Sequence, residues 1–397
     1  MRGLFLRPMN DPQPEVFASA VEDRYFPDSS RVSSLDSLRG FALLGLLTAG
    51  SVASTLEDAS LGPVPRSLVA QLSPTLWRGI HIADLFAPLF LFISGVALVF
   101  SLRGFTMRFG KDAAFLRVAR RSFWLYLLGF FCAGGFASAQ AGLPLLGGLQ
   151  RLALCHGICG FGFIFLRART LVISGAVALG VYLLLLSWFP SAPSAGADVA
   201  RWADGTTLVQ RVDARLLPHL KASGNRESFG LLTLIPSCAV CLLGVAAGTV
   251  FTRLNAGPTG GVRTLAWAGV AALVGGVGLG FLNPIIPKLW TPSYVLITSG
   301  ISLLLLVAFH LGSKGVRRST GFQPLIWMGM NSVTLYTLAR LIDFDQFAAR
   351  FVGGNAQALI NRQLFGVGGT LLLALLAPLI AVGLGAYLYR QRLYLRP

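Results

Sequence analysis

Long apolar stretches alternate with short polar connections along nearly the whole chain. Each stretch is about 20 residues long, the length that an α-helix needs to cross the hydrocarbon core of a bilayer. The pattern therefore predicts an all-α polytopic membrane helix bundle with about ten transmembrane helices. Because this number is even, both termini are expected on the same side of the membrane. The predicted spans cover about residues 35–55, 82–102, 122–142, 149–166, 170–189, 229–251, 264–283, 293–311, 322–341 and 366–389.

The polar connections divide the chain into a short tail and one membrane domain. Residues 1–30 contain prolines and charged residues but no apolar core, so we interpret them as a polar cytoplasmic N-terminal tail and not as a signal peptide. Residues 31–397 then form a single transmembrane domain. Its long outer connections, 56–76, 190–228 and 342–365, are where a functional site can be built over rigid helices.

Composition supports the membrane interpretation. The chain is 54% apolar and 12% charged, with a mean hydropathy of +0.68, whereas about a quarter of the residues in a soluble domain are charged. The net charge of +17 does not indicate nucleic-acid binding, because the basic residues lie between apolar runs and not on one continuous face. No nucleic acid is expected as a partner.

The distribution of the basic residues predicts the orientation. With an inside N-terminus, most Lys and Arg residues fall in inner connections, including the basic segment 103–121, which we expect to lie on anionic lipid. This places both termini in the cytoplasm and makes the chain a multi-pass protein of the cytoplasmic (inner) membrane. Membrane lipids are expected partners.

The five cysteines all fall inside apolar runs. Cys238 and Cys241 have CxxC spacing, but no second pair or His cluster completes a metal site. We interpret the thiols as buried and inert, and expect no metal.

Ionisable residues gather at the outer ends of the predicted spans. His81 and Asp84 open the second span and, three residues apart, share a helix face. A charge in hydrocarbon costs about 2.5–3.5 kcal/mol, so such a pair is a functional candidate. Arg151 opens the fourth span and Lys288 precedes the eighth. His accepts a proton near neutral pH, with Asp fixing its tautomer, while Arg and Lys hold a phosphate or an oxyanion. The set suits the handling of acyl or phosphate groups.

Structural roles stay open for several of these residues. Arg151 and Lys288 can also snorkel to the interface, and the His81 ring can simply bond a neighbouring helix. Asp36 and Arg39, three apart at the start of the first span, can neutralise each other as an anchor or line the path of an anionic ligand. His156 and His310, isolated in their spans, are interpreted as helix–helix contacts.

The polar residues lie in motifs that occur in one order along the chain: SLDSLRGF, ADLFAPLFLFISGVAL, GGLQRLAL, GLLTLIPSCAVCLLGVAAG, PKLWTPSYVL and GMNSVTLY. Over about residues 31–340 the chain resembles the heparan-α-glucosaminide N-acetyltransferase family and its bacterial relatives. The pieces PKLWTPSYVL and GGLQR are the most specific.

The resemblance implies transfer of an acetyl group from cytosolic acetyl-CoA, through the bundle, to an amino or hydroxyl group on the periplasmic or extracytoplasmic side. The expected acceptor is a glycan or another small molecule; in the lysosomal member it is the amino group of a terminal glucosamine. Either a base takes the proton of the attacking group, or a His carries the acetyl group covalently.

The chain departs from the family at two places. The family's catalytic His lies three residues before the Trp of the W-x-G motif; here that Trp is Trp77 and the matching residue is Pro74. His81, four residues after Trp77, is a candidate for a relocated base, paired with Asp84. The acidic DPEG motif before the sixth span is replaced by ESFG at 227–230.

Other family positions are retained. The resemblance implies cofactor-binding roles for five of them: Arg151, Lys288, Gln150, Trp290 and Asn331. It implies acceptor-side or structural roles for four more: His219, Asp213, Asp36 and Arg39.

Two functions of different classes follow. The first is a membrane acyltransferase with acetyl-CoA as the acyl donor. The second is a non-catalytic or transport-type membrane protein that keeps the same fold, which the missing family His supports. Ten-helix transporters often contain two repeated halves, and this chain has no such internal similarity. A purely structural subunit explains the scaffold but not the polar outer ends. A homodimer is left open by the sequence.

Overall fold

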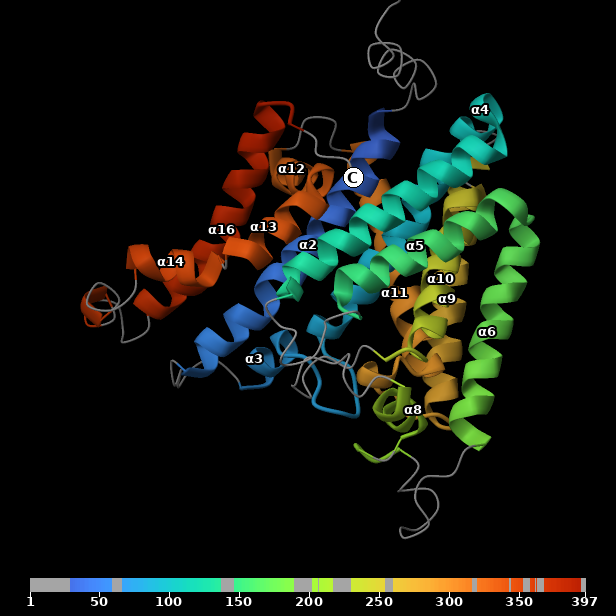
Figure 1. Ribbon diagram of the computed structural model, residues 1–397. Helices are drawn as coiled ribbons and strands as arrows, with labels where there is room; N and C mark the ends of the chain where they lie inside the picture. Colours follow the sequence, from blue (N-terminus) through green and yellow to red (C-terminus); the bar gives the residue numbers. More distant parts are fainter. Residues whose placement is uncertain are drawn as a thin grey trace, which may run out of the picture.

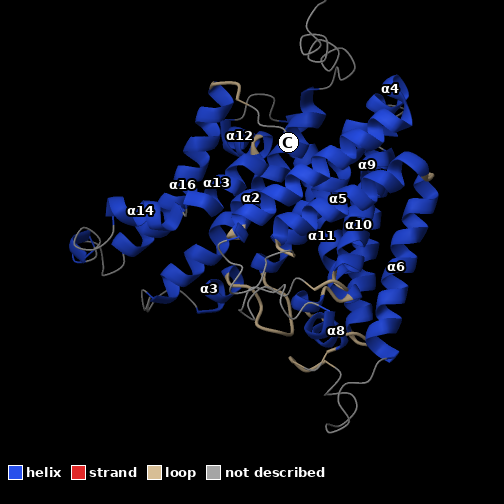
Figure 2. Ribbon diagram, in the orientation of Figure 1, coloured by secondary structure: helices blue, strands red, loops and turns tan. Residues whose placement is uncertain are grey.

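The computed structural model describes residues 29–58, 66–136, 146–188, 202–205, 207–216, 230–253, 260–315, 320–342, 344–352, 358–360, 362 and 368–393. Figure 2 shows that these residues form helices joined by turns and loops; none of them lies in a strand. The predicted all-α class is confirmed. His219 and most of the predicted tail 1–30 lie outside the described residues.

Within the described ranges, eight helical segments are long and apolar enough to cross a membrane. The polytopic class is therefore confirmed, while the number of crossings and the sidedness of the termini stay predictions. The candidate spans are Ser33–Ser54, Ile82–Cys132, Gly148–Phe165, Ala168–Trp188, Leu234–Thr252, Gly261–Gly280, Pro292–Ser313 and Leu372–Arg390.

The α-helices follow one another along the chain with short 3₁₀ turns at Ile82–Leu85, Pro287–Leu289 and Thr320–Phe322. Their bounds are α2 Ser29–Asp58, α3 Arg66–Leu72, α4 Phe86–Cys132, α5 Gly148–Phe165, α6 Ala168–Trp188, α8 Leu208–Leu216, α9 Leu234–Arg253, α10 Gly260–Gly280, α11 Pro292–Gly315, α12 Gln323–Met330, α13 Ser332–Ile342, α14 Phe344–Val352 and α16 Gly368–Arg390.

The long helix α4 is a hairpin. Gly110 interrupts it with φ 84°, a left-handed conformation that glycine adopts without a steric penalty. The guanidinium of Arg117 lies 4.5 Å from the centre of the Phe105 ring, although a straight helix would separate these residues by about 18 Å. The two helical segments on either side of Gly110, residues 86–109 and 111–132, are called the limbs of the hairpin. They therefore pack against each other in antiparallel directions. Hence the predicted connection 103–121 is itself helical and forms the turn of the hairpin; its contact with anionic lipid stays a prediction.

The predicted ninth span, 322–341, is broken at Asn331 into α12 and α13. The first half, α12, packs backbone to backbone against α2. A methyl group at Gly40 would overlap the carbonyl of Leu325, and one at Gly329 would overlap the carbonyl of Asp36. Because the pairs run in opposite order, α2 and α12 are antiparallel. Each half of the broken span is shorter than a bilayer requires.

The two ends of the bundle differ. In Figure 1 the start of α2, the end of α16 and the turn of α4 lie at the upper end, which we call the Gly110 end. The short helices α3 and α8 lie at the opposite end, which we call the α3–α8 end.

The apolar surface of the outer helices fits a lipid environment. The central core forms between α2, α4, α5, α9 and α11, with Phe92 and Val295 fully buried. By contrast, α6, α10 and α16 bury only 22%, 17% and 22% of their apolar spans. Apolar faces of this extent are not left to water in a soluble monomer, so hydrocarbon is the solvent that suits them.

Candidate functional site

The His81 ring is held by a backbone carbonyl. His81 is half-buried and immediately precedes the 3₁₀ turn that opens α4. Its Nδ1 lies 2.9 Å from the carbonyl oxygen of Ser73. Because a carbonyl only accepts hydrogen bonds, Nδ1 carries the proton and Nε2 keeps a lone pair. The ring is therefore in the tautomer that a general base requires.

Asp84 organises the backbone around His81. Its carboxylate accepts a hydrogen bond from the backbone N–H of His81 at 2.9 Å, and others from the hydroxyl and backbone N–H of Thr75. We expected Asp84 to fix the tautomer of His81. Instead the Ser73 carbonyl does so, because backbone and hydroxyl donors occupy the carboxylate.

These contacts place Pro74 beside the His81 ring. Pro74 is exposed and lies between Ser73, which bonds the ring, and Thr75, which bonds Asp84. The position that carries the catalytic His in the resembling family is therefore next to His81 in space, although seven residues separate the two in the sequence.

A series of contacts joins this segment to α11 and α5. The Tyr294 hydroxyl donates to the backbone carbonyl of Asp84 at 2.6 Å, and the Tyr294 ring packs edge-on against Trp290 at 5.8 Å. The guanidinium of Arg151 lies 4.9 Å from the centre of the Trp290 ring, a favourable cation–π geometry. Residues at the starts of the second, fourth and eighth predicted spans thus contact one another at the α3–α8 end, while their convergence on a shared reaction chamber stays a prediction.

The backbone of Trp290 is unusual. Its φ of 52° and ψ of 45° are left-handed, which is rare for a bulky residue and is found where the surroundings force it, often at functional sites. The Tyr182 hydroxyl donates to the carbonyl of Leu289, and the backbone N–H of Ile286 donates to the hydroxyl of Thr291. These bonds hold the loop that buries the Trp290 ring.

Arg151 is buried and ties α5 to α9. Its guanidinium donates to the hydroxyls of Thr233 at 2.7 Å and Ser237 at 3.2 Å. A buried guanidinium requires hydrogen-bond acceptors such as these two hydroxyl oxygens. Its neighbour Gln150 is also buried, with its amide packed against Gly147. Both residues therefore have a packing role, and their binding of a cofactor stays a prediction.

Lys288 lies on the other side of the same loop. Its ammonium is 5.9 Å from the centre of the Trp77 ring, and Trp77 donates from its indole N–H to the carbonyl of Trp202 at 2.6 Å. The backbone N–H of Gly79 donates to the carbonyl of Ile285. The W-x-G segment and the loop before α11 are therefore directly bonded.

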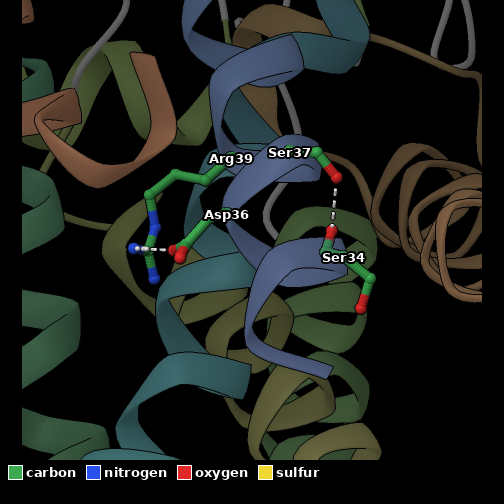
Figure 3. A network of polar contacts seen from close by, with 4 residues as sticks. All are labelled: Ser34, Asp36, Ser37 and Arg39. Atoms are coloured by element: carbon green, nitrogen blue, oxygen red, sulfur yellow. Dashed lines mark hydrogen bonds and ion pairs between the residues drawn. The ribbon is translucent and has the colours of Figure 1, made fainter. Parts of the chain in front are cut away.

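The remaining candidates lie elsewhere. Asp213 is buried and accepts a hydrogen bond from the backbone N–H of Leu231 at 3.0 Å, which ties α8 to the approach of α9. Asp36 and Arg39 form an ion pair at 3.3 Å on α2, as Figure 3 shows, so the expected mutual neutralisation is present. None of the contacts described above links this pair to His81.

Asn331 occupies the break between α12 and α13. Its side chain is 2% exposed, and within the described part of the chain neither its amide nitrogen nor its amide oxygen has a hydrogen-bond partner. It lies two residues after Gly329, which packs on Asp36. Asn331 therefore lies where α12 ends against α2, and its binding of a cofactor stays a prediction.

Tyr294, Thr233 and Ser237 were missed in the sequence analysis. Tyr294 carries a detectable signal, since it lies within the motif PKLWTPSYVL beside Trp290. Ser237 lies in the first turn of α9 and Thr233 immediately precedes that helix, but small hydroxyls in an apolar segment do not reveal an Arg partner on another helix.

Three of the five cysteines are buried and two are half-buried. Cys155 and Cys238 approach across the α5–α9 contact, with their sulfur atoms 3.7 Å apart. Among the residues whose placement is known, no group of His, Cys, Asp and Glu side chains is arranged to hold a metal ion.

The helices and the polar contacts at one end define an all-α polytopic membrane protein. No family model matches the chain. The chain is 25% identical over 322 aligned residues to human heparan-alpha-glucosaminide N-acetyltransferase; the match takes in 66% of this chain and 47% of the human protein. The chain thus spans about half the length of the curated relative it matches. This similarity supports a distant relationship to a membrane acetyltransferase.

Proposed function

We propose that the protein is a membrane-bound acyltransferase that moves an acetyl group from cytosolic acetyl-CoA to an amino or hydroxyl group of a glycan on the extracytoplasmic side. The distant similarity to the human acetyltransferase supports the reaction class. The proposal includes ten bilayer crossings, both termini in the cytoplasm, and a location in the inner membrane. The α3–α8 end then faces the acceptor.

One observation carries the assignment of the base: the His81 ring bonds the carbonyl of Ser73, directly beside Pro74. In the proposed reaction, His81 Nε2 accepts the proton of the acceptor amine or hydroxyl as its nitrogen or oxygen attacks the thioester carbonyl. The bond from carbonyl carbon to sulfur then breaks, and the CoA thiolate takes the proton back from His81. Lys288, which is half-buried beside Trp77, is the proposed holder of the developing oxyanion.

The test is a relocation of the base. His81→Asn keeps an amide N–H where Nδ1 bonds Ser73 but removes the proton acceptor, so acetyl transfer should fall about 10²–10⁴-fold while CoA binding is kept. A second variant, Pro74→His combined with His81→Asn, returns an imidazole to the family position and should recover part of the lost activity. Purified protein, acetyl-CoA and glucosamine are the assay components, with CoA thiol release as the readout.

Two results would count against this scheme in different ways. Full activity of His81→Asn would disprove the base assignment but leave the enzyme class intact. Wild-type protein that neither binds CoA nor releases thiol from acetyl-CoA would disprove acyl transfer itself.

A second candidate function is transport or ligand binding without catalysis. One observation favours it: the helix break at Asn331, where a buried amide has no hydrogen-bond partner within the described residues. Transporters place substrates at such discontinuous helices. Wild-type protein that neither binds CoA nor releases thiol from acetyl-CoA would favour this candidate.

A further inference from the structure

Four of the five cysteines lie together where α5 packs against α9. Cys155 and Cys159 are four residues apart on α5, and Cys238 and Cys241 are three residues apart on α9, so each pair shares a helix face. The Cys159 thiol contacts the thiol of Cys241 and donates to the backbone carbonyl of Cys238 at 3.6 Å. The proposed acyl transfer uses none of these thiols.

The contact between Cys155 and Cys238 suits a disulfide. Bonded sulfur atoms are about 2.05 Å apart, so the 3.7 Å between these two has to close by about 1.7 Å. Rotation of the side chains supplies a movement of this size, since each sulfur turns about its own Cα–Cβ bond. The two residues are 83 positions apart in the sequence, so a bond between them would join two separate helices of the bundle.

Arg151 places a positive charge beside this pair. Arg151 lies one turn before Cys155 on α5, and its guanidinium donates to the hydroxyl of Ser237, the residue before Cys238. Reactive cysteines are found in electropositive, partly exposed surroundings, because a neighbouring cation stabilises the attacking thiolate. Cys155 is fully buried and Cys238 is half-buried, so a small oxidant reaches Cys238 first.

The pair also lies toward the α3–α8 end. Arg151 is part of the contacts at that end, and Cys155 is one turn further into α5. The orientation proposed above places this end outside the cytoplasm. Disulfides persist there, because the systems that keep cytosolic thiols reduced are absent.

We propose that Cys155 and Cys238 form a reversible disulfide between α5 and α9, with a hydroperoxide as the oxidant. The Cys238 sulfur attacks one oxygen of the hydroperoxide and the O–O bond breaks. The departing oxygen takes the thiol proton and leaves as an alcohol, or as water when the oxidant is hydrogen peroxide.

The second step closes the bond. The Cys155 sulfur attacks the sulfenic acid at Cys238, the S–O bond breaks, and hydroxide leaves as water with the Cys155 proton. Two thiols lose two electrons in all, and the O–O bond accepts them. This chemistry needs neither CoA nor an acceptor, so its test is independent of acyl transfer.

Differential alkylation of the full chain in detergent detects the bond. Reduced protein is treated with hydrogen peroxide, denatured, and blocked with N-ethylmaleimide; it is then reduced with dithiothreitol and labelled with a polyethylene-glycol maleimide. The labelled fraction of the wild type should gain two polymer units on a gel, one for each thiol released from the disulfide. Protein that is not treated with peroxide should gain none.

The variants locate the bond. Cys155→Ser should gain at most one unit, from a sulfenic acid at Cys238 that has no thiol partner, and Cys238→Ser should gain none. The matched control is Cys132→Ser, which changes the half-buried cysteine at the end of α4, outside the cluster. It should gain two units, as the wild type does.

The proposal is overturned if peroxide-treated wild type gains no pair of units, a result that needs no variant to fold. It is also overturned if Cys155→Ser still gains two units, because the bond would then join other thiols. A bond that links two chains on a non-reducing gel would overturn it as well.

Discussion

At the scale of single residues, Asp84 and His81 hold different parts of the same turn. The Asp84 carboxylate bonds the backbone of His81 and Thr75, whereas the His81 ring bonds the carbonyl of Ser73. Stability and chemistry are therefore separable here. A change at Asp84 removes a support of the turn, while a change at His81 removes a proton acceptor.

Asp84→Ala tests this separation. The substitution leaves two backbone N–H groups and the Thr75 hydroxyl without their acceptor, and a hydrogen bond to a charged group is worth about 1.5–3 kcal/mol. We expect the melting temperature in detergent to fall for Asp84→Ala and to stay near the wild-type value for His81→Asn. Asp84→Asn, which keeps one oxygen acceptor, should lie between them. A wild-type melting temperature for Asp84→Ala would show that the carboxylate is not a structural support.

Local spacing predicted the Asp36–Arg39 ion pair, because residues three apart share a helix face. The same spacing brought Asp84 to His81, but His81 is extended and precedes the turn, so the carboxylate bonds its backbone N–H and not its ring. The contact of Tyr294 with Asp84 spans 210 residues. No periodicity encodes such a pair, because the tertiary arrangement of the helices decides it.

At the scale of elements, apolar periodicity located the helices but not the breaks between them. The charge of residues 103–121 predicted a polar connection, yet these residues are helical on both sides of Gly110. Conversely, the apolar run 322–341 predicted one span, yet the helix breaks at Asn331. Hydrophobicity reports which solvent a segment prefers, whereas backbone conformation and packing against α2 decide where the helix turns.

The Gly110 turn can be tested with a matched pair of substitutions in α4. Gly110 has φ 84°, so Gly110→Ala forces a left-handed alanine and should lower stability by about 1 kcal/mol or more. Gly104 lies in the same helix, and a Cβ there would meet no atom within 4 Å. Gly104→Ala should raise stability by about 0.5–1 kcal/mol. Thermal unfolding in detergent measures both, and shifts of the same sign would contradict a turn at Gly110.

At the scale of the whole molecule, the two ends of the bundle carry different chemistry. The Gly110 end holds the exposed Arg103, Arg108, Lys111 and Arg120, which the positive-inside rule places in the cytoplasm. The α3–α8 end holds His81, Trp290 and Arg151. A transferase with a cytosolic donor and an outer acceptor requires this separation, so sidedness is the prediction on which the proposed reaction depends.

Single cysteines at the two ends measure sidedness directly. Leu76 at the α3–α8 end is 86% exposed and Met107 at the Gly110 end is 74% exposed, so Cys at either position should react readily. In intact cells a membrane-impermeant maleimide should label Leu76→Cys, and it should label Met107→Cys only after the membrane is opened. The wild-type chain is the background control, since its native cysteines are buried or half-buried. If both variants are labelled from one side, α4 does not cross the bilayer between residues 76 and 107. If only Met107→Cys is labelled in intact cells, the bundle is inverted, and the His81 segment faces the cytosolic donor instead of the outer acceptor.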